Sequence, residues 1–392
     1  MEDIFAAFEQ AALRPLAYAR EWKRTHDSRV VGIFPMHFPG ELAHAAGALP
    51  IVLQEDQEPI TIGLSALFNF YCGYNRSIVD QALRGEFEFL DAILFGDHCV
   101  QLLGTADILR EHAPQPPILF NQLISSLSAP WAEEETRKAF AQTWKELETL
   151  VGHAITPDDV RASIRLHNRN RALIREIYQL RREGRIALSG RGLQLIVKSS
   201  MTMDTSAHTA LLERFLAEVA TRSPALRGVR VYLSGHLCQA PKPEILDLIE
   251  ECGGVVVDDD LFHGFRFVAT DIDETGDPLD ALARWHLARN RRVPCPTLTD
   301  EKADWDQFLL GAVARSKAQG LIVMQVKYCE PHMFFYPEIK EAFERAGVPH
   351  LLVETEHEQM PMEALKTRLE TFMEIVKRRA AARSAGSPHH KD

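Results

Sequence analysis

Four cysteines occupy positions where distant parts of one chain could share a cofactor. Cys99, Cys238 and Cys329 each follow an apolar run typical of a buried strand, and Cys72 lies in the unusual segment NFYCGYNRS. In open α/β sheets, ligands bind beyond the carboxyl ends of the strands. Thiolates gathered there favour an iron–sulfur or a zinc site. The alternative, that the cysteines are small buried hydrophobic residues, stays open.

The six cysteines are not equivalent in their local sequence. Cys99 and Cys329 lie at strand-to-helix turns, where helix N–H groups and the helix dipole are expected to lower the pKa of a thiol. Cys252 ends a predicted helix in IEECGG, and Cys295 lies between two prolines in RRVPCPTLTD. We expect these last two to be structural.

The elements that must position the cysteines alternate between strand and helix in two blocks. RVVGIF, ALPIVLQ, FLDAILFG and PPILFNQL are predicted strands of the first block, and helices separate most of them. Such alternation predicts a mostly parallel sheet covered on both faces. A run of long helices then intervenes, and Thr156, Pro157 and Asp159 mark one helix start.

The fold class that we predict is α/β, with two Rossmann- or flavodoxin-like lobes of mostly parallel sheet joined by a helical insert. The expected boundaries are an N-terminal helical segment at 1–28, a first lobe at 29–130, the insert at 131–224, a second lobe at 225–380 and a disordered tail at 381–392.

Composition and missing motifs narrow the function. The formal charge of −11 argues against a nucleic-acid partner. We see no signal peptide, no apolar run of about 20 residues that would span a membrane, and no disulfide pattern, so a cytoplasmic location is expected. The chain lacks a P-loop, a dinucleotide fingerprint, a CxxC pair and a GxSxG elbow. Common nucleotide-binding and hydrolase functions lose their sequence support.

Several motifs in order resemble one enzyme family. PGELAHAAGALPIVL, CGYNRSIVDQAL, FLDAILFGDHC, ECGGVVVDDDLFHGFR and IVMQVKYCEPHMFFYPEIK are similar to motifs of the 2-hydroxyacyl-CoA dehydratase and benzoyl-CoA reductase family. The resemblance covers about residues 29–378. It is strongest to the smaller, C-type iron–sulfur subunits of ATP-dependent benzoyl-CoA reductases, with the dehydratase subunits a close second.

The resemblance implies a [4Fe–4S] cluster held by three cysteines between the lobes. These map to Cys72, Cys99 and Cys329, and Cys238 is a possible fourth ligand. A fourth thiolate would close the cluster and favour electron relay over direct substrate contact. A non-catalytic electron-relay subunit and a plain zinc protein are the further alternatives.

Reaction and partners follow from the same resemblance. The expected activity is that of an oxidoreductase on CH–CH groups, which passes low-potential electrons to the aromatic ring of an acyl-CoA thioester in anaerobic aromatic degradation. A 2-hydroxyacyl-CoA dehydratase subunit is the alternative. Expected partners are a homologous iron–sulfur subunit, activator subunits that hydrolyse ATP, and ferredoxin as the upstream donor.

Other site residues are proposed from their places beside these motifs. His98, His236 and His332 are candidate proton donors, because histidine titrates in the useful range. Arg76 and Ser77, beside Cys72, are candidate substrate-binding residues; helix capping by Ser77 and a solvated Arg76 are the alternatives. The nine arginines of segment 161–192 are either CoA-phosphate contacts, a docking face or a solvated helix face.

Overall fold

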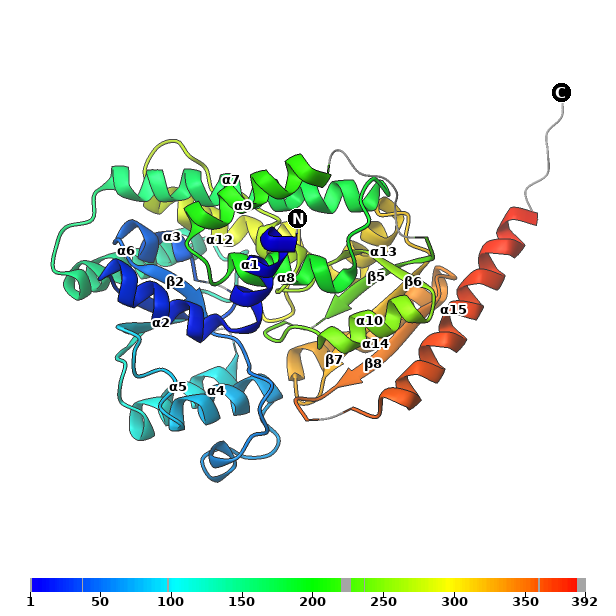
Figure 1. The fold of residues 1–392 in the computed structure, drawn as a ribbon, viewed down its shortest axis with the longest axis horizontal. Coiled ribbons are helices and arrows are strands. Elements are labelled where there is room, and N and C mark those ends of the chain that lie inside the picture. Colours follow the sequence, from blue (N-terminus) through cyan, green and yellow to red (C-terminus); the bar gives the residue numbers. More distant parts are fainter. Residues whose placement is uncertain are drawn as a thin grey trace.

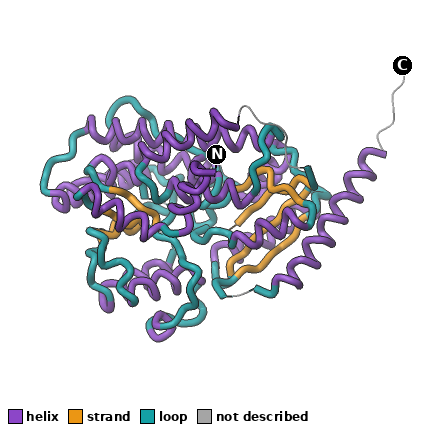
Figure 2. Tube along the Cα trace, in the orientation of Figure 1, coloured by secondary structure: helices purple, strands orange, loops and turns teal. Residues whose placement is uncertain are grey.

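The computed structural model describes residues 2–36, 38–96, 99–219, 227–235, 237–358 and 360–385. Two four-stranded parallel sheets lie side by side, and helices surround both (Figures 1 and 2). The predicted fold class is confirmed: two Rossmann- or flavodoxin-like lobes are joined by a helical insert. Among the described residues, no helix has the length and apolar character required to cross a membrane.

The first sheet has the strand order β2-β1-β3-β4, with every neighbouring pair parallel. Residues that alternate along β1 and β3 enter two separate cores, because successive side chains of a strand point to opposite faces. Val30 and Ile93 pack on one face, and Val31 and Leu94 on the other. The strands are β1 (Val30–Ile33), β2 (Leu49–Val52), β3 (Ala92–Gly96) and β4 (Ile118–Asn121).

The second sheet repeats this order as β6-β5-β7-β8, again all parallel. β7 is buried along its whole length, as expected for a central strand covered on both faces. Because the order matches, the turn after β7 corresponds to the turn after β3 in the first lobe. The strands are β5 (Val229–Gly235), β6 (Gly254–Asp259), β7 (Gly320–Val326) and β8 (His350–Thr355).

The helical insert connects the two lobes. Its long helix α7 (Pro157–Arg182) contacts α3 (Gly40–Ala45) of the first lobe and β6 of the second, and it spans the upper edge of the molecule in Figure 1. The predicted helix start is confirmed, since Thr156 and Asp159 form a reciprocal capping box. The other helices of the insert are α6 (Ala132–Val151), α8 (Gly190–Ser200) and α9 (Thr205–Val219).

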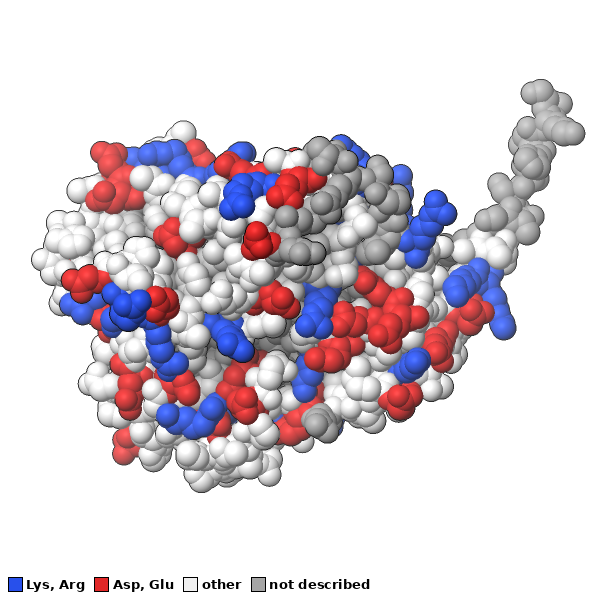
Figure 3. Space-filling model, in the orientation of Figure 1, with Lys and Arg blue, Asp and Glu red and all other residues white. Residues whose placement is uncertain are grey.

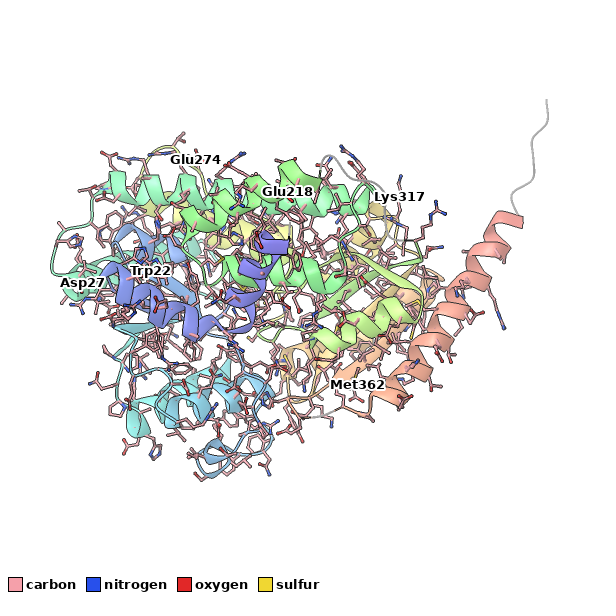
Figure 4. The ribbon with its side chains drawn as sticks, in the orientation of Figure 1. Trp22, Asp27, Glu218, Glu274, Lys317 and Met362 are labelled. Carbon is pink, nitrogen blue, oxygen red and sulfur yellow. The ribbon has the colours of Figure 1, made fainter. Side chains whose placement is uncertain are left out.

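The chain ends in the long helix α15 (Met362–Ala385). Met362, at its start, packs against the core of the second sheet, and the helix then extends away from the body (Figure 4). The helix runs five residues into the segment predicted as a disordered tail, because its alanines favour helix; residues 386–392 lie outside the described part.

The remaining elements cover the sheets or connect them. They are α1 (Glu2–Leu13), α2 (Pro15–His26), the short 3₁₀ helix η1 (Ile62–Ser65), α4 (Gly73–Leu83), α5 (Val100–His112), α10 (Pro243–Glu251), α11 (Phe265–Val268), α12 (Pro278–Arg292), α13 (Trp305–Arg315) and α14 (Glu330–Arg345).

Acidic and basic side chains are interspersed over the face drawn in Figure 3. Basic groups do not gather there into one continuous patch. The net charge of −11 is thus spread over that face rather than set against a basic stripe.

Candidate functional site

Four thiols line one cavity between the two lobes. Cys72, Cys99, Cys238 and Cys329 all border a space of about 520 Å³, and each is half-buried. The rest of the wall is mainly apolar, with a few polar side chains and backbone groups. Its other residues are Tyr74, Asn75, Val100, Gln101, Leu102, Leu237, Gln239, Pro296, Thr297, Val326, Tyr328, Glu330, Pro331, Phe334 and Phe335.

The fold explains why these cysteines meet. Cys99 follows β3 and directly precedes α5, and Cys329 follows β7 and directly precedes α14. These are equivalent turns of the two lobes, at the carboxyl ends of parallel strands, where α/β proteins bind ligands. Cys72 directly precedes α4, so three of the four thiols stand at helix N-termini. Cys238 lies in the loop that follows β5.

Burial governs the acidity of these thiols. It raises the pKa of Cys72 to about 12, against the effect of the N–H groups of Asn75. It also raises the pKa of Cys329, although the backbone N–H of His332 acts in the opposite direction. The lowered pKa predicted for Cys329 from its place at a helix start is therefore wrong, because loss of hydration outweighs the helix terminus.

Polar side chains from α4 and α5 surround Cys72. The side-chain amide of Asn75 donates to the Cys72 sulfur at 3.1 Å, and the Asn75 side-chain carbonyl oxygen accepts from Thr105 at 2.9 Å. The Gln101 side-chain carbonyl oxygen accepts from the backbone N–H of Cys72 at 2.9 Å. The sulfur is thus held by groups that are themselves fixed.

Backbone conformation is unusual beside two of the cysteines. Tyr328, just before Cys329, has φ of 65°, a left-handed conformation that costs a bulky residue on the order of 1 kcal/mol. Gly235, three residues before Cys238, has φ of 107°, and a Cβ there would stand 2.1 Å from the Met324 carbonyl oxygen. The second lobe therefore carries strained or glycine-only backbone at this cavity.

The candidate proton donors are not gathered at the cavity. His98 and His236 lie outside the described residues. His332 is fully buried, with its ring 5.1 Å from that of Trp305, and it does not line the cavity. Nothing in the described part of the site brings this imidazole into contact with a bound substrate.

Arg76 and Ser77 are engaged with protein groups. Arg76 bonds Glu358 at 3.1 Å, pairs with Glu356, and donates to the Tyr71 carbonyl oxygen at 3.0 Å. Ser77 donates to Asp56 at 3.1 Å. Neither of the two lines the thiol cavity. The Arg76 pairs connect α4 of the first lobe to the loop that follows β8, and so fix the two lobes together.

Most arginines of segment 161–192 pair with carboxylates of the protein. Arg171 contacts Glu41 at 2.6 Å, and Arg175 contacts Asp271 at 2.6 Å. The solvated or docking face predicted as one alternative describes them only in part, because these pairs link the insert to both lobes. Further pairs are Arg161–Asp158, Arg169–Glu213, Arg181–Glu250, Arg182–Asp258, Arg185–Glu183 and Arg191–Asp247.

The sequence did not indicate several residues of the site. Asn75, Gln101 and Gln239 line the cavity, yet they are neutral polar residues without a recognisable spacing. Gln239 donates to Glu55 at 2.5 Å and so connects the Cys238 loop to the first lobe. The one available signal is position, since Asn75 and Gln101 each follow a cavity cysteine by two or three residues.

The thiols border the cavity from different sides and do not converge on one point. In the described part of the chain, no three His, Cys, Asp or Glu side chains form a group suited to a single metal ion. A cofactor held by all these thiols therefore has several atoms that accept a ligand.

Comparisons with known proteins agree with the motifs. A family model described as 2-hydroxyglutaryl-CoA dehydratase, D-component, matches residues 35–376. The beta subunit of lactoyl-CoA dehydratase from Anaerotignum propionicum is 28% identical over 388 residues, covering 96% of this chain and 99% of that protein. The C-type subunit of benzoyl-CoA reductase from Thauera aromatica is 25% identical over 370 residues, covering 92% and 94%.

A third relative has a similar extent. The beta subunit of (R)-phenyllactyl-CoA dehydratase from Clostridium sporogenes is 23% identical over 376 residues, covering 96% of this chain and 99% of that protein. The resemblance that the motifs indicate is thereby confirmed. The relatives named here are subunits of dehydratases or reductases whose names include a CoA thioester.

Proposed function

Because the chain belongs to the family described as 2-hydroxyglutaryl-CoA dehydratase, D-component, we propose that it is an iron–sulfur subunit of an enzyme that acts on acyl-CoA thioesters. The observation that carries the proposal is the set of four thiols around one cavity at the carboxyl ends of both sheets. The donor set fits a [4Fe–4S] cluster, which takes thiolates at separate irons.

In this proposal Cys72, Cys99 and Cys329 hold the cluster, and Cys238 is the fourth ligand if the cluster is closed. All four border the same space, so the structure offers Cys238 as readily as the others. When bound, the cluster supplies a low-potential one-electron centre. The apolar wall excludes water from it, and the Asn75 amide hydrogen bonded to Cys72 sulfur tunes its potential.

The finer proposal is a benzoyl-CoA reductase subunit that passes electrons toward an aromatic acyl-CoA. Phe334 and Phe335 wall the cavity together with Leu102 and Leu237, which suits an electron path or a ring rather than a polar substrate. ATP hydrolysis then belongs to activator subunits, with ferredoxin as donor, because this chain has no nucleotide motif.

A second candidate is a 2-hydroxyacyl-CoA dehydratase subunit. The relatives favour it as strongly, since the lactoyl-CoA dehydratase relative is 28% identical and the benzoyl-CoA reductase relative is 25% identical. Reconstitution with the homologous subunit and its activator separates the two. Ring reduction of benzoyl-CoA supports the reductase, and loss of water from a 2-hydroxyacyl-CoA supports the dehydratase.

We place the homologous partner subunit at the mouth of this cavity. Exposed apolar side chains surround it: Phe334 is 79% exposed and Val100 is 68% exposed, and both also line the wall. Met333 on the same helix is 46% exposed. An apolar rim of this kind is typical of a protein interface, and the named relatives are themselves subunits.

Anaerobic purification with the partner, followed by iron and sulfide analysis and EPR of the reduced protein, tests the cluster. We expect Cys72→Ala, Cys99→Ala and Cys329→Ala each to lose the cluster of this chain. Cys238→Ala decides between an open and a closed cluster. Cys252→Ala is the matched control, because Cys252 ends α10 away from the cavity. Wild-type protein with zinc or without iron would overturn the proposal.

A further inference from the structure

A second cavity lies between the first lobe, the insert and α12. It has a volume of about 70 Å³ and shares no lining residue with the thiol cavity. Its wall is largely apolar and comes from both lobes. The apolar lining residues include Phe34, Met36, Val52, Met203, Phe262 and Phe267.

Three ionisable side chains in the wall have their charge settled by the protein. Glu41 accepts from Arg171 at 2.6 Å, and Arg171 also donates to the side-chain carbonyl oxygen of Asn168 at 2.6 Å. Burial lowers the pKa of His167 to about 4, so this imidazole is neutral at pH 7. Glu41 and Arg171 therefore cancel, and His167 adds no charge.

Arg289 remains as the uncompensated charge. It lies on α12, is half-buried, and its guanidinium stacks on the ring of Trp285 at 4.7 Å from the centroid. It forms no hydrogen bond and no ion pair with any residue that the structure describes. Burial lowers its pKa to about 10, which still leaves it charged at pH 7.

A cation in an apolar cavity is costly unless an anion pairs with it. We propose that this cavity is a binding site for a short-chain carboxylate whose carboxylate group pairs with the Arg289 guanidinium. Guanidinium and carboxylate match in a planar, two-pronged geometry. The apolar wall of Phe34, Met203 and Phe262 then packs around the hydrocarbon part.

The volume sets the size of the ligand. One water occupies about 10–15 Å³ on this measure, so the cavity holds about five non-hydrogen groups. Carboxylic acids of two to four carbons meet that limit. Inorganic phosphate would leave the apolar wall without a partner, and a CoA thioester is far too large.

Binding would join the two lobes, because Phe34 and Met36 come from the first lobe and Phe262 and Phe267 from the second. A bound carboxylate therefore stabilises the folded chain in proportion to its affinity. This inference does not depend on a cluster in the other cavity.

The test uses the full chain, purified anaerobically, and titrates it by calorimetry with acetate, propionate and butyrate. The uncharged amides of the same acids and inorganic phosphate are the comparison ligands. We expect a carboxylate to bind at least about tenfold more tightly than its amide, and to raise the melting temperature. Phosphate is expected to do neither.

Variants locate the site. Arg289→Met keeps the stem that packs on Trp285 and removes the charge; we expect it to bind acid and amide equally. Arg284→Met is the matched control on the same helix, because Arg284 is 48% exposed and 3.8 Å from Glu133. It should bind as the wild type does.

Two results would overturn the inference. One is wild-type protein that binds the carboxylate no more tightly than the amide, which requires no variant to fold. The other is equal carboxylate affinity in wild type and Arg289→Met. Because the readout is binding to the chain alone, these outcomes are independent of iron content and of activity on CoA thioesters.

Discussion

The side chain of Gln101 donates to the backbone carbonyl of Tyr328 at 2.9 Å and so joins the two lobes at the thiol cavity. Gln101 lies on α5, beside Cys99, whereas Tyr328 lies just before Cys329 in the second lobe. The same side chain accepts from the backbone N–H of Cys72. One buried amide therefore sets the spacing of three cysteines that come from distant parts of the sequence.

Replacing Gln101 by Leu should weaken both the fold and the site. The change leaves the Cys72 N–H and the Tyr328 carbonyl without this partner in a buried place, which costs about 1–3 kcal/mol. Urea unfolding of the metal-free chain measures that loss, and iron per chain after anaerobic purification measures the second effect. Gln142→Leu, on the exposed face of α6, serves as the control and should change neither.

Arg76 gives a second prediction about the contact between the lobes. Its side chain is 7% exposed and pairs with Glu356 and Glu358. Arg76→Met should lower the free energy of unfolding by about 2–3 kcal/mol, because Glu356 stays half-buried without its counter-ion. A cycle with Glu356→Gln measures the coupling between the two.

The control for this prediction is Arg110→Met, which breaks the exposed pair with Asp107 and should cost less than about 1 kcal/mol. If instead Arg76→Met left stability unchanged and raised only the KM for the acyl-CoA, Arg76 would be a substrate-binding residue rather than a positioning one.

The strands and the meeting of the cysteines were predictable from local patterns. The apolar runs before Cys99 and Cys329 indicate buried parallel strands, and the rule that ligands bind beyond the carboxyl ends of such strands brings their cysteines together. Thr156 and Asp159 marked a helix start because the capping box is a local interaction. Such features depend on neighbours in the sequence.

What escaped prediction depends on tertiary contacts. The carboxylates that pair with Arg171 and Arg175 are 130 and 96 residues away along the chain, so a cluster of arginines resembled a phosphate-binding face. The pKa of Cys329 rises because the fold buries it, and no spacing reveals burial of that degree. Gln101 and Asn75 acquire their roles from what they face.

Asp258 predicts how stability depends on pH. Burial raises its pKa from 3.8 to about 7, while Arg182 acts in the opposite direction. Between about pH 4 and 7 the folded chain therefore holds a proton that the unfolded chain has released. The stabilising contribution is complete below about pH 4 and is lost as pH rises toward 7.

Asp258→Asn should remove that part of the pH dependence. We expect urea unfolding of wild type between about pH 5 and 8 to show stability falling more steeply with pH than in the variant. Asp158→Asn, at an exposed aspartate of α7, should follow the wild-type curve. Parallel curves for wild type and Asp258→Asn would show that Arg182 keeps the carboxylate ionised throughout.

Phe334 tests where the partner subunit binds. It is 79% exposed on α14 at the mouth of the thiol cavity. Truncating a central aromatic residue of an interface commonly costs more than about 2 kcal/mol of binding energy. Phe334→Ser should therefore weaken association with the homologous subunit by about tenfold or more in analytical ultracentrifugation. The melting temperature of the isolated chain should stay the same, because an exposed side chain contributes little to folding.

The matched control for Phe334 is Ile375→Ser, at a 44% exposed position on α15. This variant removes a comparable apolar side chain from a helix that does not border the thiol cavity, so it should assemble normally. Loss of assembly with Ile375→Ser but not with Phe334→Ser would move the interface to α15. The thiol cavity would then open to solvent in the complex, and its apolar rim would need another occupant.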